Sequence, residues 1–213
     1  MIPTLQLGQF GRRLMLGNES SIWDVSQTSG GLSATGNSLS DNGGSFNARA
    51  YGNTPRNSGK RYFEIYNNNG TDTGSNGMPK IGVSKVNSGT DNQQLYMNGA
   101  YNYCEIDAVS NLGRVYSGYD VIATLGSSFA PTDGATIMVA MDIDTGKLWF
   151  GKNGTFSGDP AAGTGQAHTM TASVNYYPSY SYFISSGAFS GVLLKTVDAQ
   201  FTYSPPSGFV AWN

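Results

Sequence analysis

The sequence has few of the residues that crosslinks and metal sites require. Among its 213 residues it holds one cysteine, Cys104, and one histidine, His168. A single cysteine cannot form an intramolecular disulfide, and the two residues together are too few for a typical structural zinc site. The sequence therefore predicts a chain that folds without oxidation, without a bound metal and without a cofactor.

Charged residues and long apolar runs are also scarce. Charged side chains make up 12% of the chain and the net charge is −2, which gives no general attraction to nucleic acid or to an anionic membrane. No apolar run approaches the roughly 18 residues of a membrane span. The N-terminal segment places Arg12 and Arg13 after apolar residues, whereas a signal peptide has the opposite order. We expect synthesis in a cytoplasm, no nucleic-acid partner and no membrane span.

Glycine and aromatic residues are plentiful. The chain has 29 Gly, 13 Tyr and an aromatic content of 12%. Many short segments bounded by Gly, Asn, Ser and Pro favour an all-β sandwich or barrel. Disordered chains are poor in aromatic and β-branched residues, so this composition predicts a chain that buries a core.

The densest apolar stretch, residues 134–154, predicts a central hairpin. Its first strand has apolar residues on both sides, which is typical of a strand covered on both faces: Ile137, Val139, Met141 and Ile143 on one side, Met138 and Ala140 on the other. The turn at 144–146 places a glycine where a positive φ is needed. Asp142 and Asp144 could bind a hard cation, but Asp beside a turn ordinarily serves the turn itself, and we favour that role.

The first residues of the chain differ from the rest. Apolar side chains recur there between glycines that prevent a helix, and the segment is too short for a domain. Such a segment packs either on its own domain or on a partner. We expect residues 1–20 to form an extended arm that anchors the chain to a partner through Leu5, Leu7, Phe10, Arg12, Arg13 and Leu14, ahead of a domain at 21–213.

Four stretches in order resemble the core motifs of SPRY domains: GKRYFEI at 59–65, IGVS at 81–84, VAMDIDTGKLWFGKNG at 139–154 and AQFTYSPPSGFVAW at 199–212. Residues 21–40 are also similar to the opening segment of SPRY-like modules in bacteriophage proteins. The resemblance implies a twisted two-sheet antiparallel β-sandwich of SPRY or concanavalin type that is not an enzyme and recognises a partner through loops. The segments at 157–171 and 175–183 belong to this sequence alone, so the identity of the partner does not follow from the resemblance.

An active site finds no support in the sequence. A catalytic triad would have to use His168, and the acidic residues near Cys104 would raise rather than lower the pKa of its thiol. No Gly-x-Ser-x-Gly elbow is present. We expect no catalytic residues.

Two functions of different classes remain. The first is a virion structural and recognition protein, a bacteriophage fibre, tail or head-decoration subunit. Its arm would contact other virion proteins, the subunits would form a homo-oligomer, by family expectation a trimer, and the sandwich would contact a glycan or protein of the host surface. The second is a stand-alone recognition module that binds a glycan or a peptide through its loops.

A cluster of aromatic residues supplies the candidate recognition surface. Its members are Tyr176, Tyr177, Tyr180 and Tyr182, with His168 in the preceding Gly- and Ala-rich loop. Tyrosine suits such a surface because its ring packs while its hydroxyl meets water or a partner. Alternate members of the cluster, such as Tyr180 and Tyr182, would equally fit one side of a buried strand.

Overall fold

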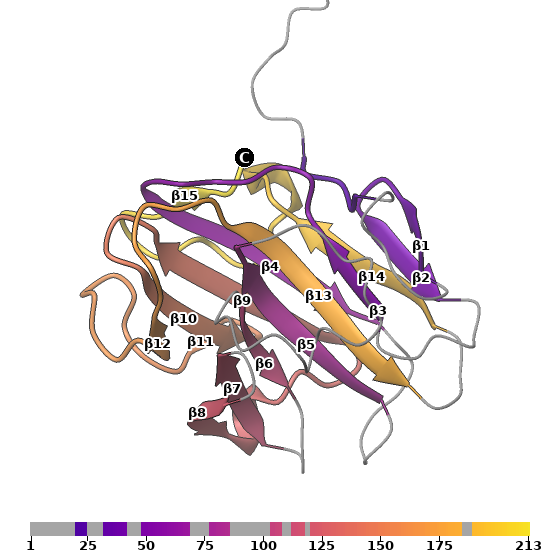
Figure 1. Cartoon of the computed structure of the whole chain (residues 1–213), viewed down its shortest axis with the longest axis horizontal. Coiled ribbons are helices and arrows are strands. Elements are labelled where there is room, and N and C mark those ends of the chain that lie inside the picture. Colours follow the sequence, from indigo (N-terminus) through magenta and orange to yellow (C-terminus); the bar gives the residue numbers. More distant parts are fainter. Residues whose placement is uncertain are drawn as a thin grey trace, which may run out of the picture.

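A computed structural model describes residues 20–24, 32–41, 48–68, 77–85, 103–107, 112–117, 120–184 and 189–213. These residues form two stacked sheets, with β13 and β5 in front of β4 and β9 in the view of Figure 1. Two short 3-10 helices, η3 (Ser127–Phe129) and η4 (Asp198–Gln200), are the helical elements of the described part. Neither has the length or the apolar character to cross a bilayer.

In the described residues the larger sheet has nine strands. Across it run β1 (Leu32–Thr35), β2 (Ser38–Asp41), β14 (Phe189–Lys195), β4 (Lys60–Asn67), β9 (Ala135–Asp142), β10 (Lys147–Lys152) and β11 (Thr155–Phe156), with β12 (His168–Thr169) beside β10 and β15 (Val210–Ala211) beside β4. Within the described residues, β15 with β4 is the one parallel pair of named strands.

The described part of the smaller sheet has six strands. Their order is β3 (Ala48–Tyr51), β13 (Tyr177–Ile184), β5 (Gly77–Ser84), β6 (Tyr103–Asp107), β7 (Gly113–Ser117) and β8 (Asp120–Gly126). Between the two sheets lies the main hydrophobic core, to which Phe63 and Val139 contribute from the larger sheet and Ile81 and Tyr180 from the smaller. The predicted two-sheet β-sandwich is confirmed.

The hairpin of β9 and β10 lies in the interior of the larger sheet, as predicted. β9 pairs with β4 on one side and with β10 on the other. Val139 and Phe150 face the main core, whereas Met138 and Trp149 belong to a second apolar cluster. Because alternate residues of a strand point to opposite faces, this second cluster lies on the outer face of the larger sheet.

The turns of the hairpin have the geometry that the sequence predicts. Gly146 has a φ of 75°, and a Cβ there would lie 2.0 Å from the carbonyl oxygen of Met170. The carboxylate oxygen of Asp142 accepts a hydrogen bond from the Thr145 N–H at 3.3 Å. That of Asp144 accepts one from the Gly59 N–H at 3.0 Å. Asp142 thus serves its own turn, the role that the sequence favours, whereas Asp144 joins the hairpin to the segment before β4.

Residues 196–213, which we call the C-terminal strap, cover part of the outer face. The Phe201 ring meets Tyr62 edge to face with centroids 4.8 Å apart, and the Phe209 ring meets Trp149 at 6.0 Å. Tyr62 and Trp149 are 0% and 1% exposed. The strap therefore gives the larger sheet a second buried face, which explains why β9 is apolar on both sides.

Candidate functional site

The outer face of the larger sheet is organised in rows of residues that lie side by side across the strands. One row joins Lys195, Glu64 and Met138, and the next joins Leu193, Tyr66 and Thr136. Neighbours in such rows have their Cβ atoms about 4.5–5.5 Å apart. The strap covers the first row at Glu64, and the second row lies just beyond the strap.

Glu64 fixes the strap to the sheet. Its side chain is 0% exposed, and its two carboxylate oxygens accept hydrogen bonds from the backbone N–H groups of Thr202 and Tyr203, each at 2.8 Å. The Lys195 ammonium lies 3.5 Å from the same carboxylate. A buried carboxylate is tolerated only when it is paired and hydrogen-bonded, and these contacts meet that requirement.

Tyr62 completes the set of donors around this carboxylate. Its hydroxyl donates to Glu64 Oε1 at 2.8 Å. Burial, followed by the negative charge and hydrogen bond of Glu64, raises the pKa of Tyr62 well above its ordinary value. The phenol therefore stays protonated and remains a donor.

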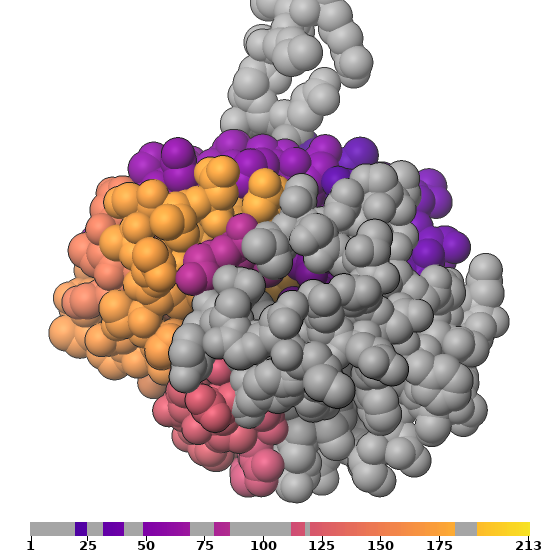
Figure 2. All heavy atoms as spheres, in the orientation of Figure 1, coloured from indigo at the N-terminus to yellow at the C-terminus, as the bar shows by residue number. Residues whose placement is uncertain are grey.

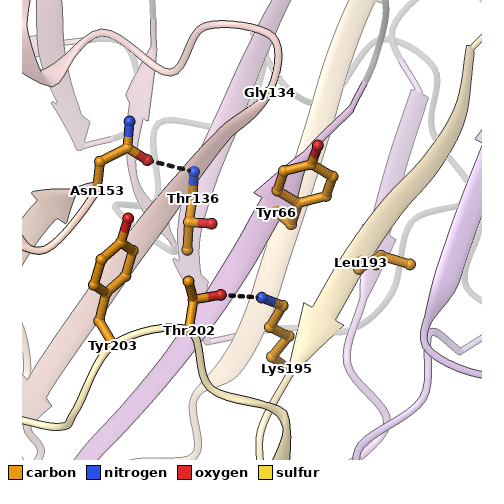
Figure 3. Close-up of a pocket in the computed structure, with 8 residues that line it drawn as sticks. All are labelled: Tyr66, Gly134, Thr136, Asn153, Leu193, Lys195, Thr202 and Tyr203. Carbon is orange, nitrogen blue, oxygen red and sulfur yellow. Dashed lines mark hydrogen bonds between the residues drawn. The ribbon is translucent and has the colours of Figure 1, made fainter.

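A pocket of about 490 Å³ opens beside the strap, over the second row. Its lining consists of Tyr66, Gly134, Thr136, Asn153, Leu193, Lys195, Thr202 and Tyr203. Figure 3 shows the Tyr66 and Tyr203 rings on two sides of this space, with Thr136 and Thr202 between them. The strap supplies one wall of the pocket and the sheet supplies the floor.

Hydrogen bonds hold the polar groups of the lining. The Asn153 side-chain oxygen accepts from the Thr136 N–H at 2.9 Å, and Lys195 Nζ donates to the hydroxyl of Thr202; both contacts are drawn in Figure 3. Among the described residues of the lining, Lys195 is the one with a charge, and its partner Glu64 supplies the opposite charge. The pocket therefore combines apolar surface with hydrogen-bonding groups and a balanced charge.

The two tyrosines are held by different neighbours. The Tyr203 ring packs against Gly154, where a Cβ would lie 3.0 Å from the ring. The Tyr66 ring lies 5.9 Å from Lys195 Nζ. Both side chains are half-buried, so each presents part of its ring and its hydroxyl to the pocket.

The candidate surface around residue 180 needs correction. Tyr176 and Tyr180 are 0% exposed members of the main core, and the Tyr176 hydroxyl donates to the Thr171 carbonyl at 2.6 Å. They match the alternative that the sequence left open, the inner side of a strand. Tyr177 is half-buried at the start of β13, and the side chain of Tyr182 lies outside the described part.

The start of β13 lies at the rim of the sandwich. Arg56 and Tyr176 form a β-bridge there, and the Gly52 N–H donates to the Pro178 carbonyl at 2.9 Å. In Figure 2 the violet segment, to which residues 52–56 belong, runs along the upper rim and meets the orange residues that lead into β13. Tyr177 is the member of the predicted cluster that the structure leaves at this rim.

His168 is not in an irregular loop as the sequence indicated. It lies in β12, opposite Leu148 of β10. It is half-buried, and burial lowers the pKa of its imidazole. Its backbone pairing fastens the segment after β11 to the edge of the larger sheet.

The structure does not describe the residues of the predicted N-terminal arm. The arm residues Leu5, Leu7, Phe10, Arg12, Arg13 and Leu14 lie outside the described residues. In the described part, no group of three or more His, Cys, Asp or Glu side chains is arranged to hold a metal ion.

The sequence analysis missed the pocket and Glu64. One signal was available, because Glu64 is an acidic residue between Phe63 and Ile65, in a strand that also carries Tyr62 and Tyr66. A charge in such a position requires a partner. The residues that provide it, Thr202 and Tyr203, are more than 130 positions away in the sequence.

Comparisons with known proteins identify the fold. No protein family model and no curated protein matches the sequence. Among solved structures, the chain is similar to the SPRY domain of human HERC1, with a TM-score of 0.62, 18% identity and coverage of 84% of this chain and 99% of that one. It is also similar to the metal-free carbohydrate recognition domain of Emp46p, with a TM-score of 0.51, 11% identity and coverage of 81% and 85%. The chain therefore has a SPRY-like β-sandwich fold.

Proposed function

We propose that this chain is a non-enzymatic recognition module that binds a glycan or a peptide. The observation that carries the proposal is the pocket beside the strap, where two tyrosines and several hydrogen-bonding groups converge on a rigid sheet. Pockets that combine apolar surface with a few placed polar groups are the usual ligand sites of proteins. Similarity to a SPRY domain and to a carbohydrate recognition domain supports a binding role.

The chemistry of the pocket favours binding over catalysis. General acid–base work needs a group that can take up or release a proton at the substrate. The Glu64 carboxylate is covered by the strap and accepts hydrogen bonds from Tyr62, Thr202 and Tyr203. Lys195 is engaged by that carboxylate and by Thr202. Neither group is poised for proton transfer.

The proposal is tested by screening the whole chain against arrayed glycans and arrayed peptides. We expect at least one ligand that is bound and recovered unchanged. If neither array yields a ligand, or if a bound compound is converted to product, the proposed function is wrong.

A second candidate places the module on a virion, as a bacteriophage fibre, tail or head-decoration subunit. It is supported by the apolar arm at residues 1–20. The arm would join the sandwich beside the strap, since Ser20 Oγ donates to Gln200 and the Ser21 N–H donates to Thr196 Oγ1 at 2.7 Å. In this setting the arm contacts other virion proteins, and the domain faces a glycan or protein of the host.

The native mass of the chain with and without residues 1–20 tests this second candidate. We expect the whole chain to assemble, as a trimer in the simplest arrangement, and the shortened chain to be a monomer. A monomer in both cases would contradict the virion proposal and would leave the recognition proposal intact.

A further inference from the structure

We propose that the pocket beside the strap binds one pyranose ring of a neutral glycan. This inference rests on the proposed function and names the ligand class of its site. The ligand would lie over Tyr66 and Thr136, with the ring of Tyr203 at its side (Figure 3). The volume of about 490 Å³ is within the range of about 300–1,000 Å³ that small-molecule sites occupy.

The balance of charge selects a neutral ligand. The ammonium of Lys195 has its counter-ion in Glu64 at 3.5 Å. That carboxylate is fixed by two backbone N–H groups of the strap, so it cannot move aside for another anion. A phosphate or a sugar acid would have to compete with Glu64 for Lys195, whereas a neutral polyol would not.

The tyrosines match the two sides of a pyranose. A sugar ring has an apolar face of C–H groups and a rim of hydroxyls, and tyrosine offers an apolar ring with a polar tip. Within the described part of the chain, neither the Tyr66 hydroxyl nor the Tyr203 hydroxyl has a hydrogen-bond partner. Both are therefore available to sugar hydroxyls without loss of a bond to another described residue.

Further donors and acceptors surround this space. The Asn153 side-chain oxygen is held by the Thr136 N–H at 2.9 Å, which fixes the amide so that its NH₂ group can donate elsewhere. The hydroxyl of Thr136 can donate or accept. Within the described residues, neither the NH₂ group of Asn153 nor the hydroxyl of Thr136 has a hydrogen-bond partner. The pocket therefore offers both a donor and an acceptor in fixed positions.

The position of the pocket disfavours a peptide. Peptides commonly bind by adding a strand to an exposed sheet edge, where unpaired backbone groups are available. The pocket floor lies in the sheet interior, because Tyr66 is paired with Leu193 of β14 on one side and with Thr136 of β9 on the other. The floor strands therefore turn their side chains to the ligand, which suits a ligand recognised by its hydroxyls and its ring.

Glu64 acts as the positioning residue of this site. It touches no ligand, but it holds the backbone of Thr202 and Tyr203 and thereby places one wall of the pocket. A wall fixed before binding reduces the ordering cost of association.

The test is calorimetric titration of the whole chain with neutral methyl glucopyranoside, galactopyranoside and mannopyranoside, and with glucuronate. We expect at least one neutral pyranoside to bind more tightly than glucuronate. Tyr66→Ala should weaken this binding about tenfold or more, as truncation of a central aromatic contact does. Tyr116→Ala is the matched control, because Tyr116 is a half-buried tyrosine of β7 on the other sheet, and it should leave the affinity unchanged.

A second variant separates folding from binding. Thr136→Val keeps the shape of the side chain and removes its hydroxyl, so it should weaken binding while the thermal midpoint stays high. Tighter binding of glucuronate than of every neutral sugar would overturn the inference. The inference would also be overturned if an array ligand bound both variants with the same affinity as the unchanged chain. In that case the recognition function would stand at another site.

Discussion

The backbone N–H of Thr202 donates a hydrogen bond of 2.8 Å to the buried carboxylate of Glu64. This contact joins the C-terminal strap to the middle of the larger sheet, across 138 positions of sequence. It closes one buried cluster on the outer face and leaves the adjacent row of residues open as a pocket. The same contact therefore serves both the stability of the sandwich and the shape of its candidate site.

Glu64→Ala should destabilise the protein and loosen the strap. Removal of one member of a buried, hydrogen-bonded ion pair costs about 3–5 kcal/mol, and here it also leaves two backbone N–H groups without an acceptor. Denaturant unfolding measures the loss, and limited proteolysis should cut residues 197–208 faster. Thr202→Ala is the control, since it keeps the N–H that Glu64 accepts. Equal effects of the two changes would mean that the carboxylate does not hold the strap.

Trp149→Ala should cost about 3–5 kcal/mol of unfolding free energy, as large buried aromatic truncations do. Trp149 is 1% exposed, and its indole N–H donates to the Thr164 carbonyl at 2.9 Å. Val210→Ala, at a residue 55% exposed, is the comparison and should cost little. A loss below about 1 kcal/mol for Trp149→Ala in denaturant melts would contradict a buried hairpin.

Stability should fall in mild acid because of His168. Burial lowers the pKa of His168 below its ordinary 6.5, so below that pH the unfolded chain binds more protons than the folded one. The contribution of His168 is fully present above pH 6.5 and is lost as the pH falls through the lowered value. The difference in unfolding free energy between the unchanged chain and His168→Gln, compared at about pH 7.5 and about pH 5.5, measures it. A pH-independent difference would show that this imidazole titrates normally.

Chelation should leave the thermal midpoint unchanged. Asp142 and Asp144 accept the backbone N–H groups of Thr145 and Gly59, which accounts for their presence without a cation. Melting with and without a chelator checks this expectation. A fall of many degrees that calcium reverses would assign these aspartates to a metal instead.

The arm should be sensitive to protease in the isolated chain and protected in an assembled particle. Burial of four apolar side chains would contribute on the order of 6–12 kcal/mol, whereas ordering about fifteen residues costs on the order of 15–30 kcal/mol of backbone entropy. The arm therefore needs backbone hydrogen bonds from a partner surface, such as a sheet edge or a groove between subunits. Limited proteolysis of residues 1–17 in both states decides this, and equal protection would place the arm in the core of its own domain.

The local pattern of the sequence determined the class of fold and the central hairpin. Alternation in β9 and β10 fixes which side chains share a face, because successive residues of a strand point to opposite sides. Gly146 supplies the positive φ of its own turn, and Asp142 accepts from Thr145 three positions further on. These features depend on short-range geometry, so the sequence was sufficient to predict them.

Only the tertiary structure decided what covers each face. Tyr176 and Tyr180 were indistinguishable from surface tyrosines until the smaller sheet was stacked on the larger one and buried them. The pocket depends on the row that joins Leu193, Tyr66 and Thr136, three residues from strands far apart in the chain. Strand order and the path of the strap are set by packing between distant segments, and no local period of the sequence records that packing.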